Sequence, residues 1–98
     1  MEKIEIRGKE LLNMEELSAI DRIPGSYIGK IKRLVKEIRK IEINIKKYNE
    51  KGFPRFSINS CVFLKTRKFE ADSEDWNFKI SLRNSFEKIL NQINHARR

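Results

Sequence analysis

Apolar residues recur at helical spacing through the middle of the chain. Between Ser26 and Tyr48 they fall three or four positions apart, at Ile31, Leu34, Ile38, Ile41, Ile45 and Tyr48. This spacing is close to the roughly 3.5-residue period of a heptad and predicts one nearly continuous amphipathic helix. Most of the intervening positions are lysine or arginine. We therefore expect a long helix that is buried along one stripe and basic elsewhere.

Shorter patterns precede this segment. Lys3–Arg7 alternates polar and apolar residues, which predicts a strand. Asn13 and Glu16 stand at the spacing of a capping box, so a first helix is expected over Met14–Asp21. Arg22-Ile23-Pro24-Gly25 then predicts a turn between the two helices, because Pro24 disfavours helical geometry at the residue before it.

In the C-terminal half of the chain, the spacing of apolar residues changes. Two apolar runs flank Asn59-Ser60, which predicts a hairpin over Arg55–Leu64 with those two residues at its tip. Lys65–Asp75 is expected to be a charged loop, and the alternating segment Trp76–Leu82 a further strand with Trp76 and Phe78 in the core. A final helix should bury Leu82, Phe86, Ile89, Leu90 and Ile93. The predicted fold is a small single α+β domain over residues 1–98, in the order β-α-α-β-β-(β)-α.

Charge narrows the choice of partner. The chain has 22 Lys and Arg against 14 Asp and Glu, a formal net charge of +8. A small protein with this excess is expected to bind a polyanion, meaning DNA, RNA or an acidic protein surface.

Two segments carry a resemblance to a known family. Leu12-Asn13-Met14-Glu15-Glu16-Leu17 is similar to the first-helix opening of small excisionases of phages and conjugative transposons, and Ile58–Phe69 resembles their wing. The resemblance covers Leu11–Phe69 and implies a winged helix-turn-helix that binds duplex DNA as a regulator or architectural factor. In that role, residues of the turn and of the exposed face of the second helix would face the groove: Arg22, Ser26, Tyr27, Lys30 and Arg33. Others would hold phosphates: Lys36, Arg39, Lys40, Arg55, Lys65, Arg67 and Lys68.

A second hypothesis comes from another class of protein. A phage-type protein of this size could bind and inhibit a host protein, its basic face mating with an acidic surface. The heptad spacing also allows a dimer seam at Ile41, Ile45 and Tyr48, so the oligomeric state is expected to be a monomer or a weak homodimer. A small basic ribonuclease is disfavoured, since no convincing set of catalytic groups is evident.

Candidate chemistry is sparse. Cys61 is the only cysteine and His95 the only histidine, and we expect the first to be buried or half-buried and the second to lie on the surface. Asp72, Glu74 and Asp75 lack the glycine and closing glutamate of a calcium loop. We therefore predict no enzyme activity, metal or cofactor. Without a signal peptide or an apolar run of ~20 residues, the expectation is a cytoplasmic protein with no membrane partner.

Overall fold

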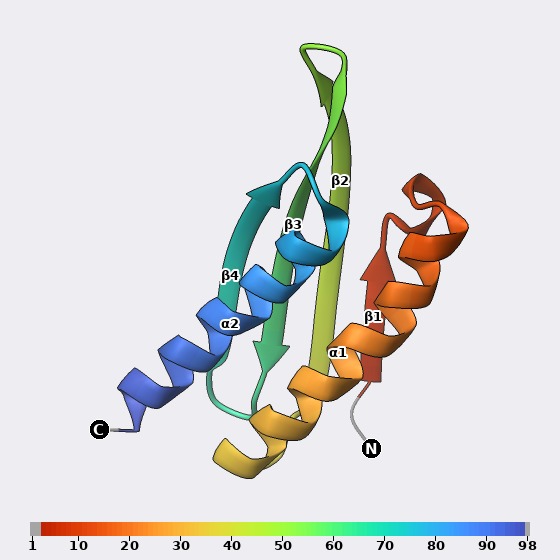
Figure 1. Ribbon diagram of the computed structural model, residues 1–98. Helices are drawn as coiled ribbons and strands as arrows, with labels where there is room; N and C mark the ends of the chain where they lie inside the picture. The colour runs from red at the N-terminus through yellow and green to blue at the C-terminus, as the bar shows by residue number, and fades with distance from the viewer. Residues whose placement is uncertain (1–2, 98) are drawn as a thin grey trace.

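The elements of the computed structural model, which describes residues 3–97, follow the order β-α-β-β-β-α (Figure 1). They are β1 (Lys3–Arg7), a short 3-10 helix η1 (Lys9–Leu11), α1 (Met14–Leu34), β2 (Lys40–Glu50), β3 (Phe53–Phe63), β4 (Lys68–Asp75) and α2 (Phe78–Ala96). The predicted α+β class is confirmed, although the order of the elements differs from the expected one.

The four strands form one mixed sheet in the order β1-β2-β3-β4. β1 runs parallel to β2, whereas β2, β3 and β4 pair antiparallel. Both helices lie on the same face of this sheet, with α2 over β3 and β4 and α1 beside it (Figure 1). The β2–β3 hairpin projects beyond the other strands, which gives the molecule its elongated shape of 43 × 26 × 19 Å.

The core lies between the helices and the covered face of the sheet. Alternate residues of β2 and β3 point into it, and Ile41, Ile43 and Ile58 are fully buried. Phe86 and Ile89 of α2 meet them from the other side and are also fully buried. Burial of each such side chain stabilises the fold by roughly 1.5–3 kcal/mol, so this layer is the main source of stability. The opposite face of the sheet carries polar side chains.

Several local predictions are confirmed. Lys3–Arg7 is a strand, and Asn13 caps α1: its backbone N–H donates to Glu16 Oε1 at 3.0 Å, while Glu16 N–H donates to Asn13 Oδ1 at 2.8 Å. Both helices bury one apolar stripe and present polar residues elsewhere. Accordingly, no helix within residues 3–97 is long and apolar enough to cross a membrane.

The predicted turn at Arg22–Gly25 is wrong, because α1 continues through Pro24. Proline within a helix costs about 3 kcal/mol. Ile20, Ile23 and Ile28 lie on one buried stripe on both sides of the proline, and each is at most 5% exposed. Burial of these three isoleucines, at roughly 1.5–3 kcal/mol each, stabilises the helix by more than the proline destabilises it.

The predicted helix over Ser26–Tyr48 is also wrong. α1 ends at Leu34, and β2 begins at Lys40. Ile41, Ile43 and Ile45 are buried because they alternate along a strand, with period two. Ile41 and Ile45 therefore belong to the core of one molecule, and the proposed dimer seam does not exist as a helical face.

The C-terminal strands were misplaced as well. The hairpin turn is Lys51-Gly52, with positive φ angles of 54° and 82°, so the predicted hairpin over Arg55–Leu64 is wrong. Asn59 lies in the middle of β3, paired with both neighbouring strands. The expected loop Lys65–Asp75 contains β4, and Trp76–Leu82 leads into α2 instead of forming a strand. Phe78 is buried as predicted, but Trp76 is 48% exposed.

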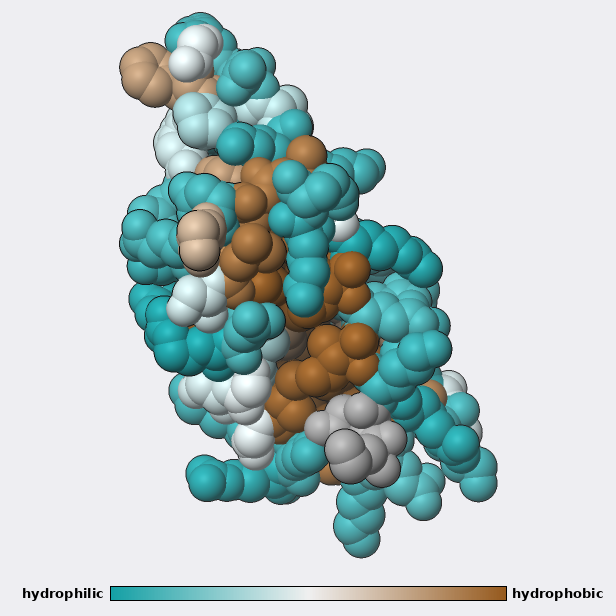
Figure 2. Space-filling view, turned by 90° about the vertical axis from the view of Figure 1, so that its right-hand side faces the viewer, coloured by the Kyte–Doolittle hydropathy of each residue, from teal (hydrophilic) through white to brown (hydrophobic). Residues whose placement is uncertain are grey.

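The edge of the sheet at β1 has an apolar character. Figure 2 shows this side of the molecule, where a brown apolar band runs between teal polar surfaces. Ile4 is 46% exposed and Leu11 36% exposed. The band continues the core to the surface along the gap between β1 and α1.

Candidate nucleic-acid interface

Cations gather where α1 ends and β1, β2 and β4 begin, at the lower end of Figure 1. Strand register creates part of this cluster: Lys3 pairs with Lys40, Lys40 with Phe63, and Phe63 with Lys68, so three lysines share one row across the sheet. The last turn of α1, the α1–β2 loop and the β3–β4 turn supply the rest. We call this surface the basic end, and it comprises Lys3, Arg33, Lys36, Arg39, Lys40, Lys65, Arg67 and Lys68.

Short backbone hydrogen bonds hold the two loops of the basic end in place. The Arg39 N–H donates to the Phe63 carbonyl at 2.8 Å, which ties the α1–β2 loop to the end of β3. The Leu64 N–H donates to the Arg67 carbonyl at 2.8 Å and closes the β3–β4 turn. The cationic side chains therefore project from anchored backbone.

The lysines of the cross-strand row are neutralised by carboxylates on the same strands. Lys3 Nζ lies 3.1 Å from Glu5, Lys40 Nζ 2.8 Å from Glu42, and Lys68 Nζ 3.6 Å from Glu70. The hydrogen bond from Lys3 lowers the pKa of Glu5, and the hydrogen bond to Glu42 raises the pKa of Lys40. Such exposed pairs contribute little to stability, but they cancel much of the local field.

The charges of the remaining cations of the basic end are not cancelled by carboxylates. Within residues 3–97, no ion pair to a carboxylate forms at Arg33, Lys36, Arg39, Lys65 or Arg67. All are exposed. The Arg67 guanidinium lies over the ring of Phe69 at 4.5 Å from its centroid, which orients the charge. A set of uncompensated cations at one end of the molecule is suited to several phosphates at once.

A second cationic feature lies between the helices. Arg22, Ser26 and Lys30 of α1 face Arg83 of α2 across a hollow of about 160 Å³. Tyr27 forms part of its wall and is buried, with its ring stacked on Phe86 at 5.4 Å. We call this feature the interhelix groove.

Tyr27 has a structural place in the groove. Its burial, followed by the neighbouring Glu87 carboxylate, raises the pKa of its hydroxyl to about 12. The ammonium of Lys30 lies 5.1 Å from the centre of the Tyr27 ring. The tyrosine thus supports Lys30, and the cations beside it form the accessible part of the groove.

The sequence prediction missed Arg83. The signal was present, because Leu82, Phe86 and Ile89 define the buried stripe of the last helix, and Arg83 lies just outside that stripe. Arg83 was not singled out because the excisionase resemblance ended at Phe69 and gave the last helix no role in binding.

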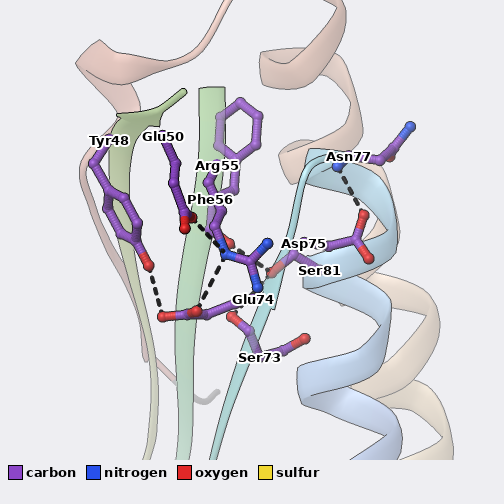
Figure 3. Close-up of polar contacts among 9 residues, drawn as sticks. All are labelled: Tyr48, Glu50, Arg55, Phe56, Ser73, Glu74, Asp75, Asn77 and Ser81. Carbon is purple, nitrogen blue, oxygen red and sulfur yellow. Dashed lines mark hydrogen bonds and ion pairs between the residues drawn. The ribbon is translucent and has the colours of Figure 1, made fainter. Parts of the chain in front are cut away.

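Arg55, which the sequence analysis grouped with the phosphate-binding residues, lies far from the basic end. It sits near the β2–β3 tip, with its Nε 3.3 Å from Glu74 and 3.7 Å from Glu50 (Figure 3). Tyr48 also donates to Glu74, at 2.7 Å. These two donors, Tyr48 first, lower the pKa of the Glu74 carboxyl. The charge of Arg55 is therefore compensated by Glu50 and Glu74 of the same molecule.

Other candidate chemistry is accounted for by burial or exposure. Cys61 is 3% exposed, and burial raises the pKa of its thiol. His95 is exposed in the last turn of α2, as predicted. Among residues 3–97, no three His, Cys, Asp or Glu side chains are grouped as metal ligands.

A mixed four-stranded sheet, covered on one face by two helices and basic at one end, defines a small α+β protein of β-α-β-β-β-α topology. Two solved structures share this fold over almost the whole chain. One is a ribosomal subunit interface protein from Coxiella burnetii, with a TM-score of 0.66, 16% identity and 97% of each chain covered. The other is the N-terminal domain of Thermus thermophilus Protein Y, with a TM-score of 0.68 and 12% identity over 97% of this chain and 98% of that chain. No family model or curated protein sequence matches the chain.

These neighbours overturn the excisionase resemblance. Their fold covers 97% of this chain, and in residues 3–97 the single helix α1 replaces the two helices of a helix-turn-helix. The expected wing, Ile58–Phe69, comprises the second half of β3, the β3–β4 turn and the start of β4, all part of the four-stranded sheet. The interpretation built on that resemblance, a phage or mobile-element regulator with duplex DNA as partner, is wrong. The separate hypothesis of an inhibitor of a host protein is also wrong, because the structural neighbours include a ribosomal subunit interface protein.

Proposed function

We propose that this protein binds ribosomal RNA on the surface of a ribosomal subunit, through the basic end and the interhelix groove. The observation that carries the proposal is the set of uncompensated cations at the basic end. RNA helices are recognised chiefly through shape, phosphates and sugar hydroxyls, which requires cations on a rigid frame. The fold shared with a ribosomal subunit interface protein supports ribosomal RNA as the target.

The proposed role is binding without a chemical step. The side chains that make up the basic end are all lysine and arginine, which neutralise phosphate charge. In the interhelix groove, Tyr27 carries no charge at neutral pH, because even the ordinary tyrosine pKa of 10.0 lies well above that pH. Both features fit a surface that neutralises phosphate charge.

The test is co-sedimentation of the purified protein with small and large ribosomal subunits over a series of salt concentrations. Binding to one subunit is expected, with an affinity that falls as salt rises because counterions are released from the RNA. A DNA duplex added as competitor is expected to displace the protein poorly. Failure to sediment with either subunit at low salt would refute the proposal.

Single-charge variants locate the surface. Lys36→Ala and Arg67→Ala should each weaken binding and reduce the slope of log affinity against log salt by about one unit. Lys9→Ala is the matched control, since Lys9 is an exposed lysine of η1 outside both cationic features. Equal effects of Lys36→Ala and Lys9→Ala would show that only net charge matters, and would exclude the basic end as the binding surface.

A further inference from the structure

The projecting end of the β2–β3 hairpin carries an aromatic cluster that the proposed function does not use. Phe53 is 66% exposed and Trp76 is 48% exposed, although large aromatic side chains are usually covered. Together with Pro54 they line a hollow of about 220 Å³ whose walls are almost entirely apolar. We call this hollow the aromatic slot.

The slot forms because β3 is longer than β4. The last pair between these strands is Phe56 with Asp75, so the three residues Phe53–Arg55 have no partner on β4. Trp76 follows β4 directly and lies beside this unpaired stretch. On the other side, the positive φ angles of Lys51 and Gly52 close the turn and fix Phe53 opposite Glu50.

The tryptophan is held in place before any ligand arrives. Phe53 meets its ring edge-on, at 6.4 Å between centroids and 85° between planes. The Arg55 guanidinium lies 5.0 Å from the centre of the Trp76 ring, and Glu74 and Glu50 fix that guanidinium by ion pairs (Figure 3). A ring restrained in this way loses little side-chain entropy when a planar ligand stacks on it.

Charge near the slot points to the class of ligand. Glu50 and Glu74 are both used by Arg55, whereas Lys47 and Lys51 form no ion pair within residues 3–97. Lys51 lies in the turn just before Phe53. Lys47 shares a neighbouring hollow with Pro54 and Trp76, and the other charged residues that line it are Glu15, Glu16 and Lys79, of which Glu15 and Lys79 form an ion pair. The slot is therefore an apolar surface flanked by two ammonium groups that form no ion pair within residues 3–97, and the one of Lys47 lies 5.5 Å from the centre of the Phe56 ring.

We propose that the aromatic slot stacks an unpaired base of RNA, with Lys47 and Lys51 reaching the adjoining phosphates. Single-stranded RNA is recognised by stacking on aromatic side chains with cations along the backbone, as this arrangement allows. The inference rests on the proposed function and adds to it: the basic end binds the folded part of the RNA, and the slot takes a base from a loop or an end.

Trp76 is the only tryptophan, so its fluorescence reports on the slot alone. The probe is a dye-labelled octamer of riboadenosine, with binding followed independently by anisotropy of the dye. Stacking should quench the Trp76 emission in step with binding. Inorganic polyphosphate should compete through the lysines without quenching, because it has no bases, and equal quenching by polyphosphate would overturn the inference.

Phe53→Ser should weaken octamer binding about tenfold, in the range measured for loss of one stacking aromatic. Phe53 is mostly exposed, so the variant is expected to fold. Ile4→Ser is the matched control, since Ile4 is an exposed apolar residue that pairs with Ile41 at the far end of the sheet. Equal losses in the two variants would overturn the inference.

The two proposals fail in different ways. If the octamer binds by anisotropy while Trp76 emission stays unchanged, the stacking site is refuted and RNA binding stands. If neither the octamer nor a ribosomal subunit binds, RNA binding itself is refuted. If Phe53→Ser weakens binding to an intact subunit but not to the octamer, the slot contacts a protein, which also overturns base stacking.

Discussion

Replacing Gly25 by alanine tests the continuity of α1 at the point where the sequence predicts a turn. Gly25 follows Pro24, and the structure places both inside a helix. A Cβ added at Gly25 would meet no atom within 4 Å, so alanine fits without strain. Glycine in an exposed helix interior is about 1 kcal/mol less favourable than alanine. Gly25→Ala should therefore raise the free energy of unfolding by about 1 kcal/mol.

Gly52→Ala is the matched control. A Cβ there would also meet nothing within 4 Å, but Gly52 has a φ of +82°, in the left-handed region. The same methyl group should then cost about 1–2 kcal/mol, because only the backbone conformation differs between the two sites. The pair isolates conformation from packing.

Urea and thermal unfolding followed by far-ultraviolet circular dichroism would measure both changes. For a chain of this size, 1 kcal/mol corresponds to about 4–8 °C in Tm, so the variants should move in opposite directions by an easily resolved amount. A loss of stability in Gly25→Ala would mean that residue 25 needs a turn conformation. The continuous α1 would then be refuted.

Two further predictions concern buried polar groups. Ser85→Ala should cost about 1–3 kcal/mol in urea unfolding, because it leaves the buried Ser60 hydroxyl, now 2.8 Å from Ser85, without a partner. Ser60→Ala should cost less, since Ser85 still donates to the Leu82 carbonyl, and equal losses would contradict this account. The second concerns Tyr27, whose folded pKa of about 12 lies above its ordinary value of 10.0. The protonated Tyr27 hydroxyl therefore contributes to the free energy of unfolding in full below pH 10, and this contribution is lost as the pH rises through about 12. Tyr27→Phe should flatten the decline of the free energy of unfolding at alkaline pH, as measured by denaturation curves.

Local signals predicted part of the fold correctly. The capping box at Asn13, the alternation of Lys3–Arg7 and the apolar spacing of the last helix each depend on a few neighbouring residues. Pro24 misled the prediction because its penalty is local, whereas the burial that outweighs it comes from the sheet and α2. The free energy gained by this burial could not be evaluated before the elements that pack against α1 were known.

The candidate nucleic-acid interface likewise has one part that local spacing predicts and another part that depends on how the strands pair. Arg22, Ser26 and Lys30 are spaced four apart, so their common helix face was readable from the sequence, and they do line one groove. The row of Lys40 and Lys68 beside Phe63 was not readable, because it depends on the register of three strands. Arg55 was misplaced for the same reason. A hairpin tip at Asn59-Ser60 would bring Arg55 beside Leu64 and Lys65, whereas the observed turn at Lys51-Gly52 puts Arg55 at the opposite end of the sheet.

The misassigned Ser26–Tyr48 segment leads to a last prediction. Leu34, Ile38, Ile41 and Ile45 fit a helical stripe, and Ile41, Ile43 and Ile45 equally fit a strand. Ile43 separates the two interpretations, because a helix would turn it away from the stripe and toward the lysines, whereas in β2 it is 0% exposed.

Ile43→Asp should therefore leave the protein unfolded at 25 °C. Truncating a buried isoleucine costs about 2–5 kcal/mol, and the uncompensated carboxylate adds the cost of burying a charge, against a total stability of about 5–15 kcal/mol. Tyr48→Ser is the comparison, since the helix would make Tyr48 a core residue, while β2 leaves it 40% exposed with a hydrogen bond to Glu74. It should cost about 1 kcal/mol. If Ile43→Asp folds and Tyr48→Ser does not, the strand β2 is refuted and the predicted helix over Ser26–Tyr48 is supported. Only a helical stripe buries Tyr48 and exposes Ile43.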